Sequence, residues 1–162
     1  MTIEHLSDRI EDYKKTIKTV VDKRLYWDET VKPLLLSLLE NLCKTYPIGW
    51  STQQLKWLQN TEAINITFES FPPELLDCTN LVPAFQFLGG GALIFSQSYS
   101  GDVAIFMILP AVGHDISEEY TVDLGIYRPS EVDQKLIIEK VDEFLKRMIE
   151  WEVPTHQKKL GF

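Results

Sequence analysis

The residues that come closest to a catalytic or metal-binding pattern are His114 and Asp115, which stand side by side in a polar segment between two strand-like runs. A histidine beside a carboxylate can act as a general base or hold a metal ion. The other histidines, His5 and His156, lie near the two ends of the chain, and no nucleophile or second ligand stands at a metal-binding spacing from His114. We therefore predict a solvated loop with no metal site and no cofactor, and keep His114 and Asp115 as candidate ligand contacts.

Acidic residues close to this pair could supply the two carboxylates that acid–base catalysis needs. Glu118-Glu119 and Asp123 are near neighbours along the chain, but only the fold decides whether two of them face each other across a pocket. Arg128 follows the last strand-like run and is the third polar candidate for a ligand contact. The sequence names no catalytic residue and favours a protein that is not an enzyme.

Three consecutive glycines, Gly89-Gly90-Gly91, form the most glycine-rich segment of the chain. A phosphate-binding loop would continue into a helix and carry a lysine, whereas this segment continues into an apolar strand-like run. We therefore predict a break or bulge in the sheet, where the backbone of Gly90 could approach a ligand or a partner closely. Ser98-Tyr99-Ser100-Gly101 lacks the strand-to-helix context of a nucleophile elbow and has the composition of a turn.

The four tryptophans of the chain are its largest apolar anchors, and packing in a core or an interface is the expected use of such side chains. Trp50 follows Gly49 near a junction between helix and sheet, so it is also a candidate for the wall of a ligand pocket. Cys43 and Cys78 lie 35 positions apart and form no Cys-x-x-Cys pair. This spacing predicts two reduced thiols that behave as small apolar residues.

The net charge of −8 is unevenly distributed along the chain. Thr61–Tyr127 contains nine acidic residues and no lysine or arginine, while the segments on either side are close to neutral. Nucleic acids and anionic membranes are bound largely through lysine and arginine, so we predict neither as a partner. The acidic segment has two interpretations: a face that meets a basic protein or a cationic ligand, or a negative surface that keeps an aromatic-rich sheet soluble.

An apolar stripe at alternating spacings of three and four residues predicts a helix from about Ile3 to Leu25. The stripe consists of Ile3, Leu6, Ile10, Tyr13, Ile17 and Val20. This heptad-like spacing ends where Arg24 takes the next position; it could pair with another chain or pack on the rest of the domain, and we expect the second. Pro33 interrupts the helix over Trp27–Lys32, and a leucine-rich second helix follows and ends before Pro47.

After the second helix the apolar period changes to two, and the runs are joined by short turns, which predicts an antiparallel sheet. The predicted strands are Gln54–Gln59, Ile64–Ser70, Ala92–Ser98, Val103–Leu109 and Tyr120–Ile126. Ala84–Leu88 is an apolar run that could add a sixth strand.

A final helix is predicted after Arg128-Pro129, where Ser130 stands at the N-cap position and Asp133 completes a capping-box-like arrangement. Pro154 ends this helix, and Thr155–Phe162 is predicted to be a flexible tail. The order of the elements predicts a single α+β domain over residues 1–162. Its antiparallel sheet of four to six strands packs against two N-terminal helices and one C-terminal helix.

The first residues of the chain carry acidic side chains and no apolar run, and no segment is apolar enough to span a membrane, which predicts a cytoplasmic protein. The acidic segment and the heptad-like helix favour a non-enzymatic protein-interaction module of the chaperone, immunity or adaptor type. Its partner would be another protein or a second copy of the chain in a homodimer. The alternative is a small-molecule-binding protein or an enzyme with a pocket between sheet and helices. His114, Asp115, Arg128, Trp50 and Gly90 are the candidates for that pocket.

Overall fold

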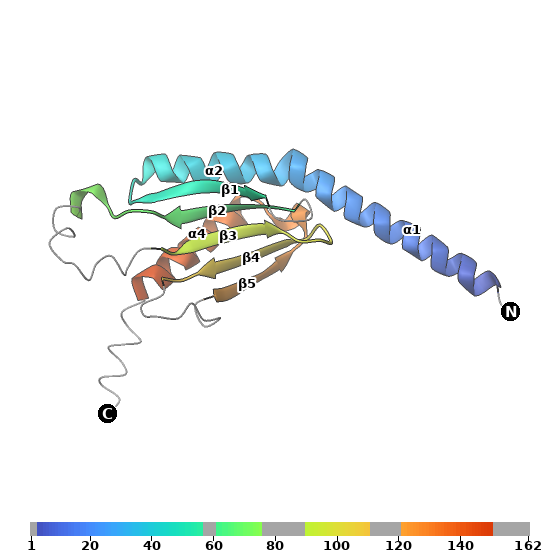
Figure 1. The fold of residues 1–162 in the computed structure, drawn as a ribbon. Helices are drawn as coiled ribbons and strands as arrows, with labels where there is room; N and C mark the ends of the chain where they lie inside the picture. Colours follow the sequence, from blue (N-terminus) through green and yellow to red (C-terminus); the bar gives the residue numbers. More distant parts are fainter. Residues whose placement is uncertain (1–2, 57–60, 76–89, 111–120, 151–162) are drawn as a thin grey trace, which may run out of the picture.

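One antiparallel sheet of five strands lies at the centre of the computed structural model, which describes residues 3–56, 61–75, 90–110 and 121–150. The strands are β1 (Trp50–Lys56), β2 (Glu62–Phe68), β3 (Ala92–Gln97), β4 (Val103–Ile108) and β5 (Thr121–Tyr127). Each strand pairs with the one that follows it in the chain (Figure 1). This meander is the arrangement that short connections favour, and it confirms the predicted α+β class.

Most strand boundaries lie within two residues of the predicted ones, and β1 is the exception. It begins at Trp50, four residues before the predicted start at Gln54. Trp50, opposite Phe68 in β2, is followed by four polar residues, Ser51 to Gln54. Hydrogen bonding to β2, and not an apolar pattern, therefore defines this part of the strand. The predicted Ala84–Leu88 strand lies outside the described residues.

The N-terminal helix does not stop at the predicted interruption. α1 (Ile3–Tyr26) continues through a π-helical turn (Trp27–Val31) into α2 (Lys32–Thr45). Pro33 accounts for the wider turn, because its ring lacks an N–H and crowds the carbonyl oxygen four residues earlier. The N–H of Lys32 bonds instead to the carbonyl of Trp27, five residues back. The predicted interruption is therefore a bend within one continuous helical rod, as Figure 1 shows.

The C-terminal helix, α4 (Gln134–Glu150), begins later than its predicted cap. Ser130 lies inside a short 3-10 turn (Pro129–Glu131), and it is Asp133 whose side chain accepts a hydrogen bond from the N–H of Leu136, at 2.8 Å. The prediction of Ser130 as the N-cap was wrong. The residues after β5 form a 3-10 turn that begins at Pro129. The α-helix therefore starts only after this turn, where Asp133 caps it.

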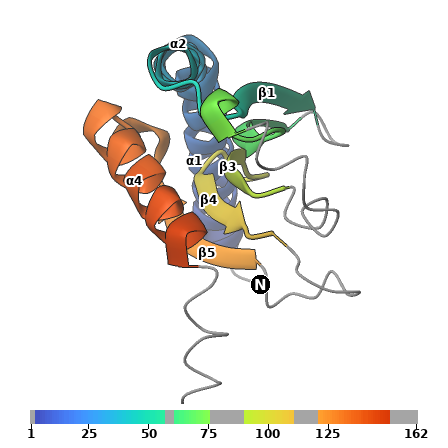
Figure 2. The same ribbon diagram turned by 90° about the vertical axis from the view of Figure 1, so that its left-hand side faces the viewer.

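The hydrophobic core lies between one face of the sheet and the two helices α2 and α4, which Figure 2 shows together on that face. Its largest fully buried side chains include Trp27, Leu35, Phe95 and Phe144. α1 continues past the sheet, and its N-terminal end lies well away from the rest of the chain (Figure 1). Among the described residues, no helix combines the length and apolar character needed to cross a membrane.

The turn between β3 and β4 anchors the C-terminal end of α1 to the domain. Gly101 in this turn has a φ of +93°, and a Cβ at that position would lie 2.6 Å from the Cβ of Lys23. Lys23 in turn holds Asp102 through an ion pair of 2.9 Å. Contact with the domain thus begins near residue 20, and the helix before that point has no partner within the described residues.

Candidate functional site

The structure does not bring the polar sequence candidates together into one site. His114 and Asp115 lie outside the described residues, as do Glu118 and Glu119. Asp123 is exposed and accepts a hydrogen bond from the N–H of Gly125, at 2.9 Å. Arg128 is 74% exposed and pairs with Glu131 at 3.3 Å. Asp123 lies within β5, beside an irregularity in its pairing with β4, and Arg128 precedes the 3-10 turn, so both contacts are local and structural.

The two remaining candidates, Trp50 and Gly90, have different surroundings. Trp50 is 7% exposed, stacks on Phe68 with ring centroids 5.5 Å apart, and donates its indole N–H to the carbonyl of Tyr46 at 2.7 Å. Gly90 has a φ of +103°, and a Cβ added there would meet no atom within 4 Å. Trp50 therefore packs at the edge of the hydrophobic core, while Gly90 faces open space.

Trp50 forms part of a shallow apolar groove between α2 and α4, with a volume of about 360 Å³. The groove is lined by Leu42, Tyr46, Ile48, Trp50, Ile138, Val141, Asp142 and Leu145. Only Asp142 carries a charge, and its carboxylate pairs with Lys146 at 3.2 Å. Trp50 thus lines a groove, whereas Gly90 is not among the lining residues, and a ligand contact at either residue stays a prediction.

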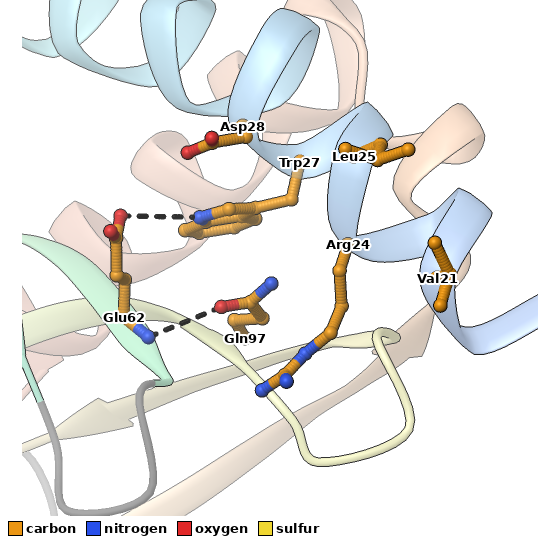
Figure 3. A pocket seen from close by; sticks show the side chains of 7 residues that line it. All are labelled: Val21, Arg24, Leu25, Trp27, Asp28, Glu62 and Gln97. Carbon is orange, nitrogen blue, oxygen red and sulfur yellow. Dashed lines mark hydrogen bonds between the residues drawn. The ribbon is translucent and has the colours of Figure 1, made fainter. Parts of the chain in front are cut away.

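A second cleft, also of about 360 Å³, lies where the helical rod crosses the start of β2, at Glu62, and the end of β3, at Gln97. Figure 3 shows its lining residues, which come from α1, the π turn and the two strands. The indole of Trp27 donates to Glu62 at 3.5 Å, and the N–H of Glu62 donates to the side-chain oxygen of Gln97 at 3.3 Å. Lys32 completes the group, with its Nζ 3.0 Å from a carboxylate oxygen of Glu62.

The carboxyl group of Glu62 titrates differently from a free glutamate. Partial burial by itself raises its pKa, but the hydrogen bond and the charge of Lys32 outweigh this effect, with help from the Trp27 indole and the charge of Lys56. The net result is a lowered pKa, so Glu62 is ionised at neutral pH. A group held as a carboxylate in this way is suited to binding and structural roles, and a general acid would need the opposite shift.

Arg24 extends from α1 into the same cleft (Figure 3). Its Nε and one of its terminal nitrogens are buried and have no hydrogen-bond partner among the described residues. An arginine with unsatisfied buried nitrogens is costly unless another group meets it. In the sequence, Arg24 is distinguished only as the end of the apolar stripe, and that break in the pattern is the available signal for this residue.

The apolar stripe on α1 has no partner among the residues that the structure describes. None of the 24 residues of this helix is buried. The exposed fractions are 69% for Ile3, 61% for Leu6, 46% for Ile10, 66% for Tyr13 and 46% for Ile17. The expectation that the stripe packs on its own domain was wrong for this part of the helix, because residues 3–17 precede the first contact of α1 with the domain near residue 20.

Within the described residues, no group of three or more histidine, cysteine, aspartate or glutamate side chains is placed to hold a metal ion. No protein-family model, no curated protein and no solved structure matches this chain. Its function therefore has to be inferred from its own surfaces.

Proposed function

We propose that this chain is a non-enzymatic protein-interaction module and that the apolar stripe of α1 is its docking surface. The observation that carries the proposal is the exposure of five large apolar side chains along one face of a helix that buries none of its residues. Contiguous exposed apolar surface of this kind marks interaction sites in soluble proteins. A chaperone, immunity or adaptor role is the class of function we propose for it.

The physical argument concerns what keeps α1 helical. Most of the stability of a protein helix comes from packing its apolar face and not from intrinsic propensity. The part of α1 before residue 20 has no such packing among the described residues, and its apolar side chains occur every three or four residues where a partner helix could cover them. A docked partner would supply the missing contacts.

The proposal is tested by photo-crosslinking in cells. A photoreactive phenylalanine analogue replaces Leu6, which is on the stripe, or Asp8, which lies on the opposite face of the same helical turn and is also exposed. We expect adducts with a protein, whether another chain or a second copy, from position 6 and none from position 8. Equal adduct yields from both positions, or none from position 6, would contradict the proposal.

The groove beside Trp50 favours a second candidate, a binding site for a small apolar molecule. Its volume of about 360 Å³ lies at the lower end of what such sites occupy. The test compares two substitutions on α4: Ile138→Arg, inside the groove, and Ile149→Arg, which is 75% exposed and outside it. Binding of an apolar fluorescent dye should fall with Ile138→Arg alone; an equal response of both variants excludes the groove.

A further inference from the structure

The charges of α1 are divided into two halves of opposite sign. Its first half, Ile3–Tyr13, has four acidic residues and one arginine, whereas Lys14–Arg24 has five basic residues and one aspartate. Two such helices lying parallel would place like charges together, whereas an antiparallel pair places each acidic half against a basic half. The helix is thus electrostatically complementary to a reversed copy of itself.

The apolar stripe has a register that fits the same arrangement. Ile3, Ile10 and Ile17 occupy one heptad position, and Leu6, Tyr13 and Val20 the other. In an antiparallel pair, each residue of the first set faces one of the second set. The register in which Ile10 of one helix faces Tyr13 of the other also places Leu6 opposite Ile17 and Ile3 opposite Val20. Every layer of this pair is apolar, and Arg24 lies beyond its end.

The residues that flank these layers also distinguish the two orientations. In the antiparallel register, Ser7 lies opposite Lys14 of the other helix, and Arg9 lies opposite Thr16, so no like charges meet. In a parallel pair, Arg9 of one helix would face Lys14 of the other. Repulsion between these two cations disfavours the parallel pair.

The exposed surface is also large enough for a weak specific interface. Covering the stripe on two copies would bury on the order of 1,200 Å² in total, which is near the lower limit for specific protein interfaces. The first contact of α1 with its own domain lies near residue 20, where Val20 and Lys23 meet the turn at Gly101. Among the described residues, the helix before this point has no contact with the domain and can pair, and Val20 meets the turn through its backbone carbonyl oxygen.

From these observations, which rest on the docking role proposed for α1, we infer that the partner of α1 is a second copy of this chain. The two helices pair antiparallel, with Ile10 of each packed against Tyr13 of the other. The dimer is reversible, because the interface covers less than three heptads. The antiparallel orientation places the two sheet domains at opposite ends of the helix pair.

Sedimentation equilibrium on the full chain tests the dimer. We expect a concentration-dependent monomer–dimer equilibrium. Ile10→Glu should raise the dissociation constant by about 100-fold, because it places a carboxylate in an apolar layer. Thr19→Glu puts the same side chain on the outward face of the helix and should change the constant by less than about five-fold. Equal effects of the two substitutions, or a monomer at all concentrations, overturn the inference.

Disulfide formation tests the orientation, in a chain whose native cysteines, Cys43 and Cys78, are replaced by alanine. Leu6→Cys mixed with Ile17→Cys should form a heterodimeric disulfide. Leu6→Cys alone should not dimerise covalently, because the two copies of position 6 lie roughly 16 Å apart along an antiparallel pair. A disulfide from Leu6→Cys alone shows a parallel pair and overturns the inference.

The outcomes separate this inference from the proposed function. Photo-adducts from position 6 with other proteins, together with a monomer by sedimentation, overturn self-pairing and leave the docking role of α1 in place. A monomer that also gives no adduct from position 6 overturns both.

Discussion

The Nζ of Lys32 lies 3.0 Å from a carboxylate oxygen of Glu62, and this ion pair joins the helical rod to the strand that opens the cation-free segment of the chain. Both side chains are largely shielded, with 24% and 17% of their surfaces exposed. Asp102, in the turn after β3, is paired in the same way with Lys23. Residues 61–127 contain no lysine or arginine, and the N-terminal helices supply a cation at two acidic residues of this segment, Glu62 and Asp102.

Lys32→Met should destabilise the fold at neutral pH by about 1–2 kcal/mol, because it leaves the Glu62 carboxylate shielded from water without its partner. The folded-state pKa of Glu62 is lowered, so the pair's contribution is complete above the unfolded pKa of 4.5 and is lost as the pH falls through the folded pKa. Urea unfolding of the wild type and of Lys32→Met should therefore converge as the pH falls below 4.5.

Lys146→Met is the matched control, since its ion pair with Asp142 has both side chains more than 60% exposed. It should change the unfolding free energy by less than about 0.5 kcal/mol at every pH. A constant difference between the wild type and Lys32→Met from pH 7 down to the acid range would contradict the assignment of the pH dependence to Glu62.

Arg24→Met should stabilise the isolated chain. The substitution keeps much of the side-chain length and removes two buried nitrogens that have no hydrogen-bond partner among the described residues. We expect a gain of about 1 kcal/mol in the free energy of unfolding, measured by chemical denaturation. Arg147→Met, at an exposed position of α4, should have little effect. A loss of stability for Arg24→Met would show that the guanidinium is satisfied in solution.

Gly49→Ala should be much more damaging than Gly90→Ala, although both glycines have positive φ values, +96° and +103°. A Cβ at position 49 would collide with the backbone of Ser70, whose N–H donates to the carbonyl of Gly49, whereas a Cβ at position 90 meets nothing. Both variants place a residue with a Cβ at a positive φ, which costs about 1 kcal/mol. The clash at Gly49 should add at least as much again to the loss of stability. Thermal unfolding of the two variants compares them directly; equal losses would show that the contact with Ser70 relaxes freely.

Leu35→Ala and Leu6→Ala should differ sharply, although both leucines belong to the same helical rod. Leu35 is fully buried, so its truncation should cost about 3 kcal/mol. Leu6 is 61% exposed, and its truncation should cost less than about 0.5 kcal/mol when unfolding is measured at concentrations well below the dissociation constant of the proposed dimer. A large loss from Leu6→Ala under those conditions would mean that the stripe packs on its own domain.

Local patterns were enough to predict the strands and helices that have a clear apolar period. The strand of Ala92–Gln97 and its partner Val103–Ile108 were predicted almost to the residue, because two short, largely apolar runs on either side of a polar turn are typical of a buried hairpin. β1 was placed late, because its polar residues are held by pairing with β2 and carry little pattern of their own. The cap of α4 was misplaced because Ser130 and Asp133 both suit an N-cap, and the backbone after Pro129 decides between them.

The candidate site was much less predictable. The groove wall at Trp50 could be anticipated from its place at a helix–sheet junction. The cluster of Trp27, Lys32 and Glu62 could not, because Glu62 follows the other two by 35 and 30 residues and meets them only where the helical rod crosses β2. Arg24 joins the cleft for the same reason.

The sequence by itself determined the α+β class, the acidic segment and the heptad spacing of α1, because each depends on residue types at short separations. Only the tertiary structure decided what those features face. The π turn before Pro33 joins α1 to α2 in one bent rod. The stripe lies on the part of this rod that extends beyond the sheet and stays exposed, and the same path brings Lys23 to Asp102 and Lys32 to Glu62. Whether an apolar stripe lies in the core or on the surface depends on the direction in which its helix runs relative to the sheet. The spacing of residues along the helix does not determine that direction.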